Sequence, residues 1–76
     1  MKLFEIVSRV FNIPIDQIDE ESNPQTIDEW DSFTGYVLLD EIETIFNVSI
    51  SMDESLKITS VGDFKNILNE KGINFE

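Results

Sequence analysis

In three segments of this chain the apolar residues recur every three to four positions, the spacing that places them on one face of an α-helix. The segments run from about residue 3 to 12, from 32 to 46 and from 60 to 71. Only residues 48–50 alternate as a strand does, and this run is too short and has no second run to pair with. The sequence therefore predicts an all-α fold.

Residues with known preferences for helix ends mark where these helices should stop and start. Pro14 has no amide hydrogen and biases the preceding residue away from helical angles, so the first helix should end near Asn12. Ser51 and Glu54 fit a capping box that begins one short helical turn. The residues expected to face the core are Leu3, Ile6, Val7, Val10, Phe11, Gly35, Leu38, Leu39, Ile42, Ile45, Phe46, Val61, Phe64, Ile67 and Leu68.

Residues 14–31 are mostly acids and turn formers, and they should form a long loop between the first two helices. Four apolar residues interrupt this segment and are expected to pin it to the core: Ile15, Ile18, Ile27 and Trp30. A short helical turn is expected at 16–18.

The architecture predicted is a four-helix bundle with three main helices and one short helix. Residues 1–76 should form a single domain, because so short a chain cannot enclose a second core.

Composition excludes several classes of function. The chain has no cysteine and no histidine, so it cannot assemble a Ser-His or Cys-His nucleophile, and we expect that it is not an enzyme. Its formal net charge of −11 would repel nucleic acid and anionic membrane surfaces but attract basic protein surfaces. No acidic segment has the ligand spacing of a calcium-binding hand, and no metal site is expected.

The hydropathy of the chain points to a cytoplasmic protein. The longest uninterrupted apolar run, residues 36–39, is far too short to span a membrane. Glu5 and Arg9 interrupt the amino-terminal segment, where a signal peptide would be uniformly apolar. We therefore expect a soluble monomer without membrane contact.

The start of the second helix, residues 29–35 with the sequence EWDSFTG, is the most informative segment. Asp31 and Ser32 are ordinary helix-opening residues, whose side-chain oxygens can accept hydrogen bonds from first-turn amides. That role does not explain why Phe33, Tyr36 and Val37 fall on the solvent side of the same helix. An exposed apolar patch rimmed by carboxylates is typical of a protein docking surface.

The position of Ser32 suits a modified hydroxyl. A phosphate ester on its oxygen would lie beside free backbone amides and the positive end of the helix dipole, both of which favour negative charge. Gly35 would allow this end of the helix to approach its neighbours closely, at a cost of about 1 kcal/mol in helix propensity relative to alanine.

These features resemble the acyl and peptidyl carrier proteins, which are small acidic four-helix domains. Their hallmark is Asp-Ser-Leu at the start of the second helix, matched here by DSF at 31–33. The acidic helix ending in EIETIF and the segment KITSVGDFKNIL also resemble the family, so the similarity covers nearly the entire chain.

The resemblance implies a function and a set of roles. Ser32 would carry 4'-phosphopantetheine taken from coenzyme A, attached by a phosphopantetheinyl transferase, and Asp31 would assist that attachment. The arm would hold acyl, aminoacyl or other biosynthetic intermediates as thioesters. A loading ligase and downstream enzymes with basic docking surfaces would be the partners. The partner-binding residues expected are Phe33, Tyr36, Val37, Asp40, Glu41 and Glu43.

Two departures from the family pattern narrow the pathway. Phe33 stands where the family usually has leucine, and Trp30 stands where fatty-acid carriers have a small residue. Trp-Asp-Ser is similar to free-standing carriers of specialised pathways, which load amino acids, hydroxy acids or short acyl groups. The alternative hypothesis is an interaction module that keeps the carrier fold without modification and uses the same acidic helix to bind proteins.

Overall fold

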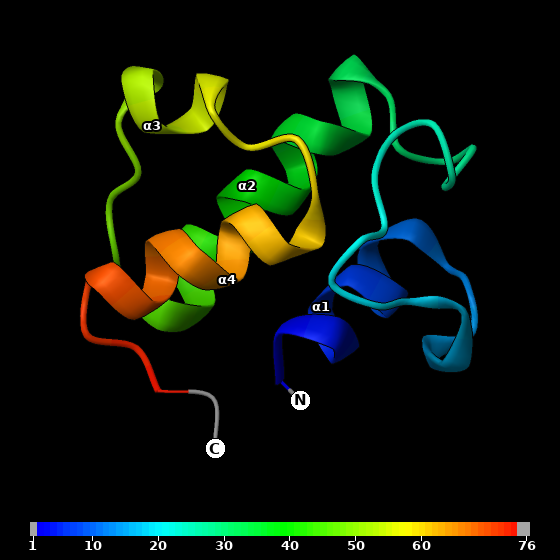
Figure 1. The fold of residues 1–76 in the computed structure, drawn as a ribbon, viewed down its shortest axis with the longest axis horizontal. Coiled ribbons are helices and arrows are strands. Elements are labelled where there is room, and N and C mark those ends of the chain that lie inside the picture. Colours follow the sequence, from blue (N-terminus) through cyan, green and yellow to red (C-terminus); the bar gives the residue numbers. More distant parts are fainter. Residues whose placement is uncertain (1, 75–76) are drawn as a thin grey trace.

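The computed structural model describes residues 2–74 and consists of helices joined by loops (Figure 1). The elements are α1 (Lys2–Phe11), the 3₁₀ turn η1 (Ile15–Gln17), α2 (Ser32–Phe46), α3 (Met52–Leu56) and α4 (Val61–Glu70). No strand occurs among these described residues. The predicted all-α class, with three main helices, one short helix and a long first connection, is confirmed.

The first helix ends where the sequence predicts. α1 stops at Phe11, and Asn12 adopts a left-handed backbone conformation with φ of 57°, which asparagine tolerates better than most residues. The Ile13 amide donates to the Ser8 carbonyl at 3.2 Å, and the Ser8 hydroxyl donates to the Ile13 carbonyl at 2.6 Å. These two bonds close the helix end and turn the chain toward Pro14.

The loop between α1 and α2 is pinned by three of the four predicted residues. Ile18, Ile27 and Trp30 are buried, but Ile15 is 45% exposed, so the prediction for Ile15 is wrong. Ile15 is the first residue of η1, a turn that directly follows Pro14 and in which no residue is buried. The predicted helical turn at 16–18 is therefore present but starts one residue earlier.

The same loop is fastened to the beginning of α4 by backbone hydrogen bonds. The Val61 amide donates to the Ser22 carbonyl at 2.9 Å, and the Gly62 amide donates to the Glu20 carbonyl at 2.8 Å. The Lys65 ammonium lies 2.8 Å from a Glu20 carboxylate oxygen. Because the first amides of a helix have no partner within the helix, the loop satisfies them and is held in return.

The core lies between α1, α2 and α4. Its fully buried side chains are Leu3, Ile6, Val7, Leu38, Ile42, Val61 and Leu68. Ile45, predicted to face inward, remains 36% exposed because it lies at the edge of the inward face in the last turn of α2. No helix within residues 2–74 is long and apolar enough to cross a membrane.

The ends of the short and last helices carry serine caps. The Ser51 hydroxyl accepts from the Glu54 amide at 3.1 Å, and the Glu54 carboxylate accepts from the Ser51 amide at 2.9 Å, so the predicted capping box is confirmed. Ser60 caps α4 without this reciprocal bond, by accepting from the Asp63 amide at 3.2 Å. The capping box satisfies two backbone amides at the start of the five-residue helix α3.

We predict that Gly62→Ala destabilises the fold by about 1–3 kcal/mol, because the added Cβ would lie 2.8 Å from the Glu20 carbonyl oxygen. Alanine favours helices, so propensity alone predicts the opposite sign. Asn66→Ala, an exposed change in the same helix, is the matched control and should be neutral or slightly stabilising. Urea unfolding measures both, and an equally stable Gly62→Ala protein would contradict the packing described.

Candidate functional site

Asp31 caps the amino terminus of α2. Its Oδ1 accepts hydrogen bonds from the amides of Phe33 at 3.0 Å and Thr34 at 2.9 Å. The Thr34 hydroxyl oxygen accepts in turn from the Asp31 amide at 2.8 Å, which completes a capping box that the sequence reasoning missed. The spacing Asp31-x-x-Thr34 was the sequence signal for this capping box.

Hydrogen bonds from the Thr34 amide and hydroxyl, and then from the Phe33 amide, hold the pKa of Asp31 below its ordinary value of 3.8.

Ser32 is the first residue of α2, and its side chain is exposed. Its hydroxyl makes no hydrogen bond to any of residues 2–74. The prediction that both Asp31 and Ser32 accept from first-turn amides therefore holds only for Asp31, which occupies the capping position. An exposed hydroxyl without an internal partner is accessible to an enzyme that modifies it.

The expectation that a phosphate on Ser32 would meet free first-turn amides holds only for the amide of Ser32 itself, which has no hydrogen-bond partner within residues 2–74. The amides of Phe33 and Thr34 already bond the Asp31 carboxylate, and the Gly35 amide donates to the Asp31 carbonyl at 2.8 Å. The carboxylate also places a negative charge at the positive end of the helix. The chain therefore presents Ser32 without a ready-made anion site around it.

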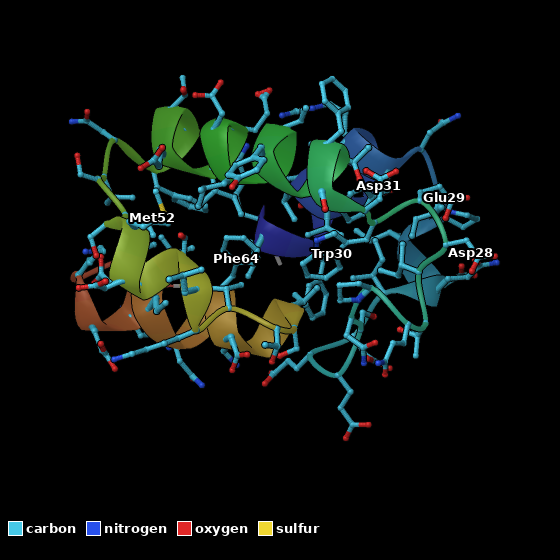
Figure 2. The ribbon with its side chains drawn as sticks, turned by 90° about the horizontal axis from the view of Figure 1, so that it is seen from above. Asp28, Glu29, Trp30, Asp31, Met52 and Phe64 are labelled. Carbon is cyan, nitrogen blue, oxygen red and sulfur yellow. The ribbon has the colours of Figure 1, made fainter. Side chains whose placement is uncertain are left out.

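Trp30 lies directly before the cap and anchors it to the core. Its indole ring packs between Phe11, with ring centroids 5.5 Å apart, and Phe64, with centroids 6.4 Å apart. Figure 2 shows Trp30 and Phe64 in the space between α2 and α4. A methyl group on Gly35 would lie 3.2 Å from the indole nitrogen, so glycine permits the predicted close approach of the helix to this ring.

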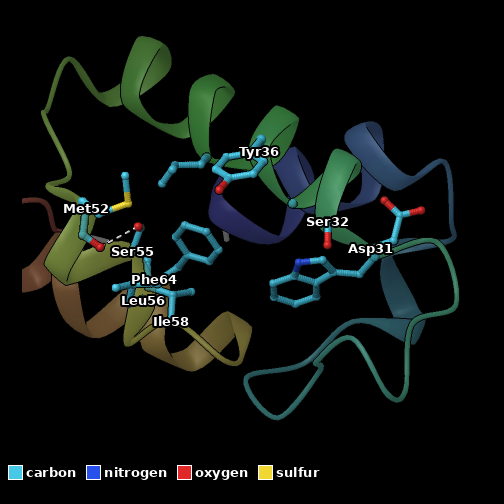
Figure 3. Close-up of a pocket in the computed structure, with 11 residues that line it drawn as sticks. Asp31, Ser32, Tyr36, Met52, Ser55, Leu56, Ile58 and Phe64 are labelled. Atoms are coloured by element: carbon cyan, nitrogen blue, oxygen red, sulfur yellow. Dashed lines mark hydrogen bonds between the residues drawn. The ribbon is translucent and has the colours of Figure 1, made fainter.

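A pocket of about 250 Å³ opens beside Ser32, between the first half of α2, helix α3 and Phe64 of α4 (Figure 3). Its lining residues are Trp30, Asp31, Ser32, Gly35, Tyr36, Leu39, Met52, Ser55, Leu56, Ile58 and Phe64. The sequence did not predict this pocket, because α3 forms one wall and its position depends on tertiary packing. The pocket is mainly apolar, and the Ser32 side chain is part of its lining.

The predicted apolar patch on α2 is exposed, and α3 extends it. Phe33, Tyr36 and Val37 are 76%, 68% and 38% exposed, respectively. Met52 and Leu56 of α3 are 69% and 73% exposed and line the same pocket as Tyr36, although they were not predicted as surface residues. The sequence signal for this exposure was the shortness of α3, because a helix of five residues cannot bury every apolar side chain that it carries.

The three acids predicted to bind partners differ in their surroundings. Asp40 is exposed and has no hydrogen bond or ion pair within the described part of the chain. Glu41 lies 3.7 Å from the Arg9 guanidinium. Contrary to its predicted outward position, Glu43 turns one oxygen to the Ile50 amide, which donates to it at 2.8 Å. Glu43 therefore holds the connection between α2 and α3.

Comparison with known proteins does not assign this chain to a family. No protein-family model matches this chain, and a search of curated proteins finds no relative. Among residues 2–74, no group of three or more acidic side chains is placed to hold a metal ion.

The Asp31 cap predicts a specific pH dependence of stability. Because folding lowers the pKa of this carboxyl, its stabilising contribution is complete above the unfolded pKa near 3.8 and is lost as pH falls through the lower folded value. Wild type should therefore exceed Asp31→Asn in stability near neutral pH, and the difference should fade in acid. Urea unfolding across this range measures it, and an undiminished difference in acid would contradict the cap.

Proposed function

We propose that this chain is a carrier protein, not itself an enzyme, that bears 4'-phosphopantetheine on Ser32. The observation that carries the proposal is the exposed Ser32 hydroxyl at the first position of α2, directly after Asp31, which makes no hydrogen bond within residues 2–74. The sequence Asp-Ser-Phe and the acidic helical fold support the same reading. The thiol of the arm would supply the nucleophile that a chain without cysteine and histidine lacks.

The attachment is a phosphoryl-group transfer. The Ser32 oxygen forms a bond to phosphorus in the coenzyme A pyrophosphate, the bond to the adenosine bisphosphate portion breaks, and the transferase accepts the hydroxyl proton. In the proposed complex Asp31 contributes its Oδ2, which has no hydrogen-bond partner within residues 2–74 while Oδ1 caps the helix. That free oxygen suits a metal ion shared with the pyrophosphate and the transferase.

The local electrostatics suit a mobile arm. Because the Asp31 carboxylate occupies the first-turn amides, the phosphodiester would find few backbone donors and one negative neighbour. The phosphate would therefore stay in solvent rather than fold against the helix. A carrier that delivers a thioester to several enzymes requires such freedom of the arm.

The surface around Ser32 suits transient docking. The exposed side chains of Phe33 and Tyr36 provide apolar contact, and Asp40 provides a free negative charge. A net charge of −11 would accelerate encounter with basic partner surfaces. The partners proposed are the phosphopantetheinyl transferase, a ligase that loads the cargo and the biosynthetic enzymes that use it.

We predict that incubation with coenzyme A and a broad-specificity phosphopantetheinyl transferase increases the intact mass by one phosphopantetheine group. Ser32→Ala should abolish the increase, because it removes the oxygen that is modified. Ser51→Ala is the matched control, since Ser51 is also an exposed serine at a helix start, and it should retain the increase. An unchanged wild-type mass with several transferases would support the unmodified interaction module instead, which the 76% exposure of Phe33 favours.

We predict that Asp40→Lys weakens binding of the transferase at low salt without changing the thermal midpoint, because Asp40 has no hydrogen-bond or ion-pair partner among the described residues. Glu43→Lys should also lower the midpoint, since it removes the acceptor of the Ile50 amide. Binding titrations and thermal unfolding separate the two effects. Equal transferase affinity of wild type and Asp40→Lys at low salt would contradict the docking surface.

A further inference from the structure

The indole N–H of Trp30 is a nearly buried donor without an acceptor. Trp30 is only 8% exposed, yet its Nε1 donates no hydrogen bond to any of residues 2–74. No fully enclosed side-chain nitrogen or oxygen within that range lacks a partner. Nε1 is therefore not fully enclosed, and it can donate to water or to another acceptor from outside residues 2–74.

The indole nitrogen lies next to Gly35, one of the residues that line the pocket beside Ser32. Trp30, Gly35 and Ser32 all line this pocket, and Nε1 lies against Gly35, where an added methyl group would approach it to 3.2 Å. The absence of a side chain at Gly35 thus leaves the nitrogen uncovered on that side. A donor in this position faces a recess that begins at the proposed attachment point.

An unpaired indole N–H in a mainly apolar recess carries a desolvation cost that a hydrogen-bond acceptor would offset. Tryptophan usually satisfies this group when it is buried. Phenylalanine would serve the stack with Phe11 and Phe64 without that cost. The donor is therefore available to a ligand that carries an oxygen acceptor.

The lining of the pocket limits the chemistry of that ligand. Leu39, Ile58 and Phe64 supply apolar walls. The Ser55 hydroxyl donates its hydrogen to the Met52 carbonyl at 2.8 Å, so toward a ligand the Ser55 oxygen can act only as an acceptor. The Trp30 indole therefore supplies a fixed donor in this recess.

We propose that the Trp30 indole N–H donates a hydrogen bond to an oxygen of the group attached at Ser32. This inference rests on the proposed attachment at Ser32. The acceptor has two possible sources with the same chemistry: an amide or hydroxyl oxygen of the arm, or a carbonyl or hydroxyl oxygen of a short cargo.

Trp30 is the only tryptophan, so one indole cross-peak in a ¹H–¹⁵N spectrum reports on this bond. Four samples are compared: the unmodified protein, the phosphopantetheinylated protein, and that protein loaded with butyryl or β-hydroxybutyryl thioester. The indole proton should move to lower field, and its exchange with water should slow by about twofold to tenfold, once the acceptor is present. The exchange rate distinguishes a hydrogen bond from a change in ring-current shift alone.

The samples identify the source of the oxygen. If the indole signal changes on phosphopantetheinylation, the acceptor oxygen belongs to the arm. If it changes only after loading, and with both thioesters, the acceptor is the thioester carbonyl. If it changes only with the β-hydroxybutyryl thioester, the acceptor is the cargo hydroxyl. An indole signal with unaltered position and exchange in all three modified samples would overturn the inference. The same change in Ser32→Ala treated with the same reagents would also overturn it, since nothing is attached there.

Intact mass measured on each sample separates this test from the proposed function. A sample that gains no mass contradicts attachment at Ser32. A sample that gains the full mass but leaves the indole signal unaltered contradicts only the role of Trp30.

Discussion

The structure depends on the packing of Trp30 between Phe11 and Phe64, which joins α1, the long loop and α4 immediately before α2 begins. Burial of a large aromatic ring is worth several kcal/mol, with truncation to alanine costing about 3–5 kcal/mol in typical cores. The ring also fixes the direction in which the chain leaves the core. Because Asp31 and Ser32 follow directly, their positions at the helix tip depend on this contact.

At the start of α2, the Asp31 side chain accepts hydrogen bonds from backbone amides, whereas the Ser32 hydroxyl makes no hydrogen bond within residues 2–74. Asp31 accepts from two first-turn amides, and Thr34 completes the reciprocal cap, so the helix needs nothing from Ser32. The hydroxyl is then exposed at the first position of a helix. Gly35 leaves room for the Trp30 ring beneath, and α3 closes a pocket next to the hydroxyl. The site is thus assembled from contacts that each have a structural reason.

The parts of the fold that local sequence determines were predictable. Helical spacing located α2 at residues 32–46, and the Ser51–Glu54 box located α3, because both signals act within a few residues. Long-range contacts were not predictable in this way. The bond between Glu43 and the Ile50 amide, the fastening of the loop to α4 and the exposed Ile15 all depend on how separate segments meet. The candidate site divides similarly: the sequence indicated Ser32, but only tertiary structure reveals the pocket and the unpaired indole N–H.

The central claim is that Ser32 carries a phosphopantetheine arm in the cell. The most direct measurement is tandem mass spectrometry of the peptide containing Ser32, from protein isolated from the cells that naturally produce it. The account predicts fragment ions that place phosphopantetheine, free or bearing a thioester, on the Ser32 oxygen. A protein population in which Ser32 is uniformly unmodified would contradict it.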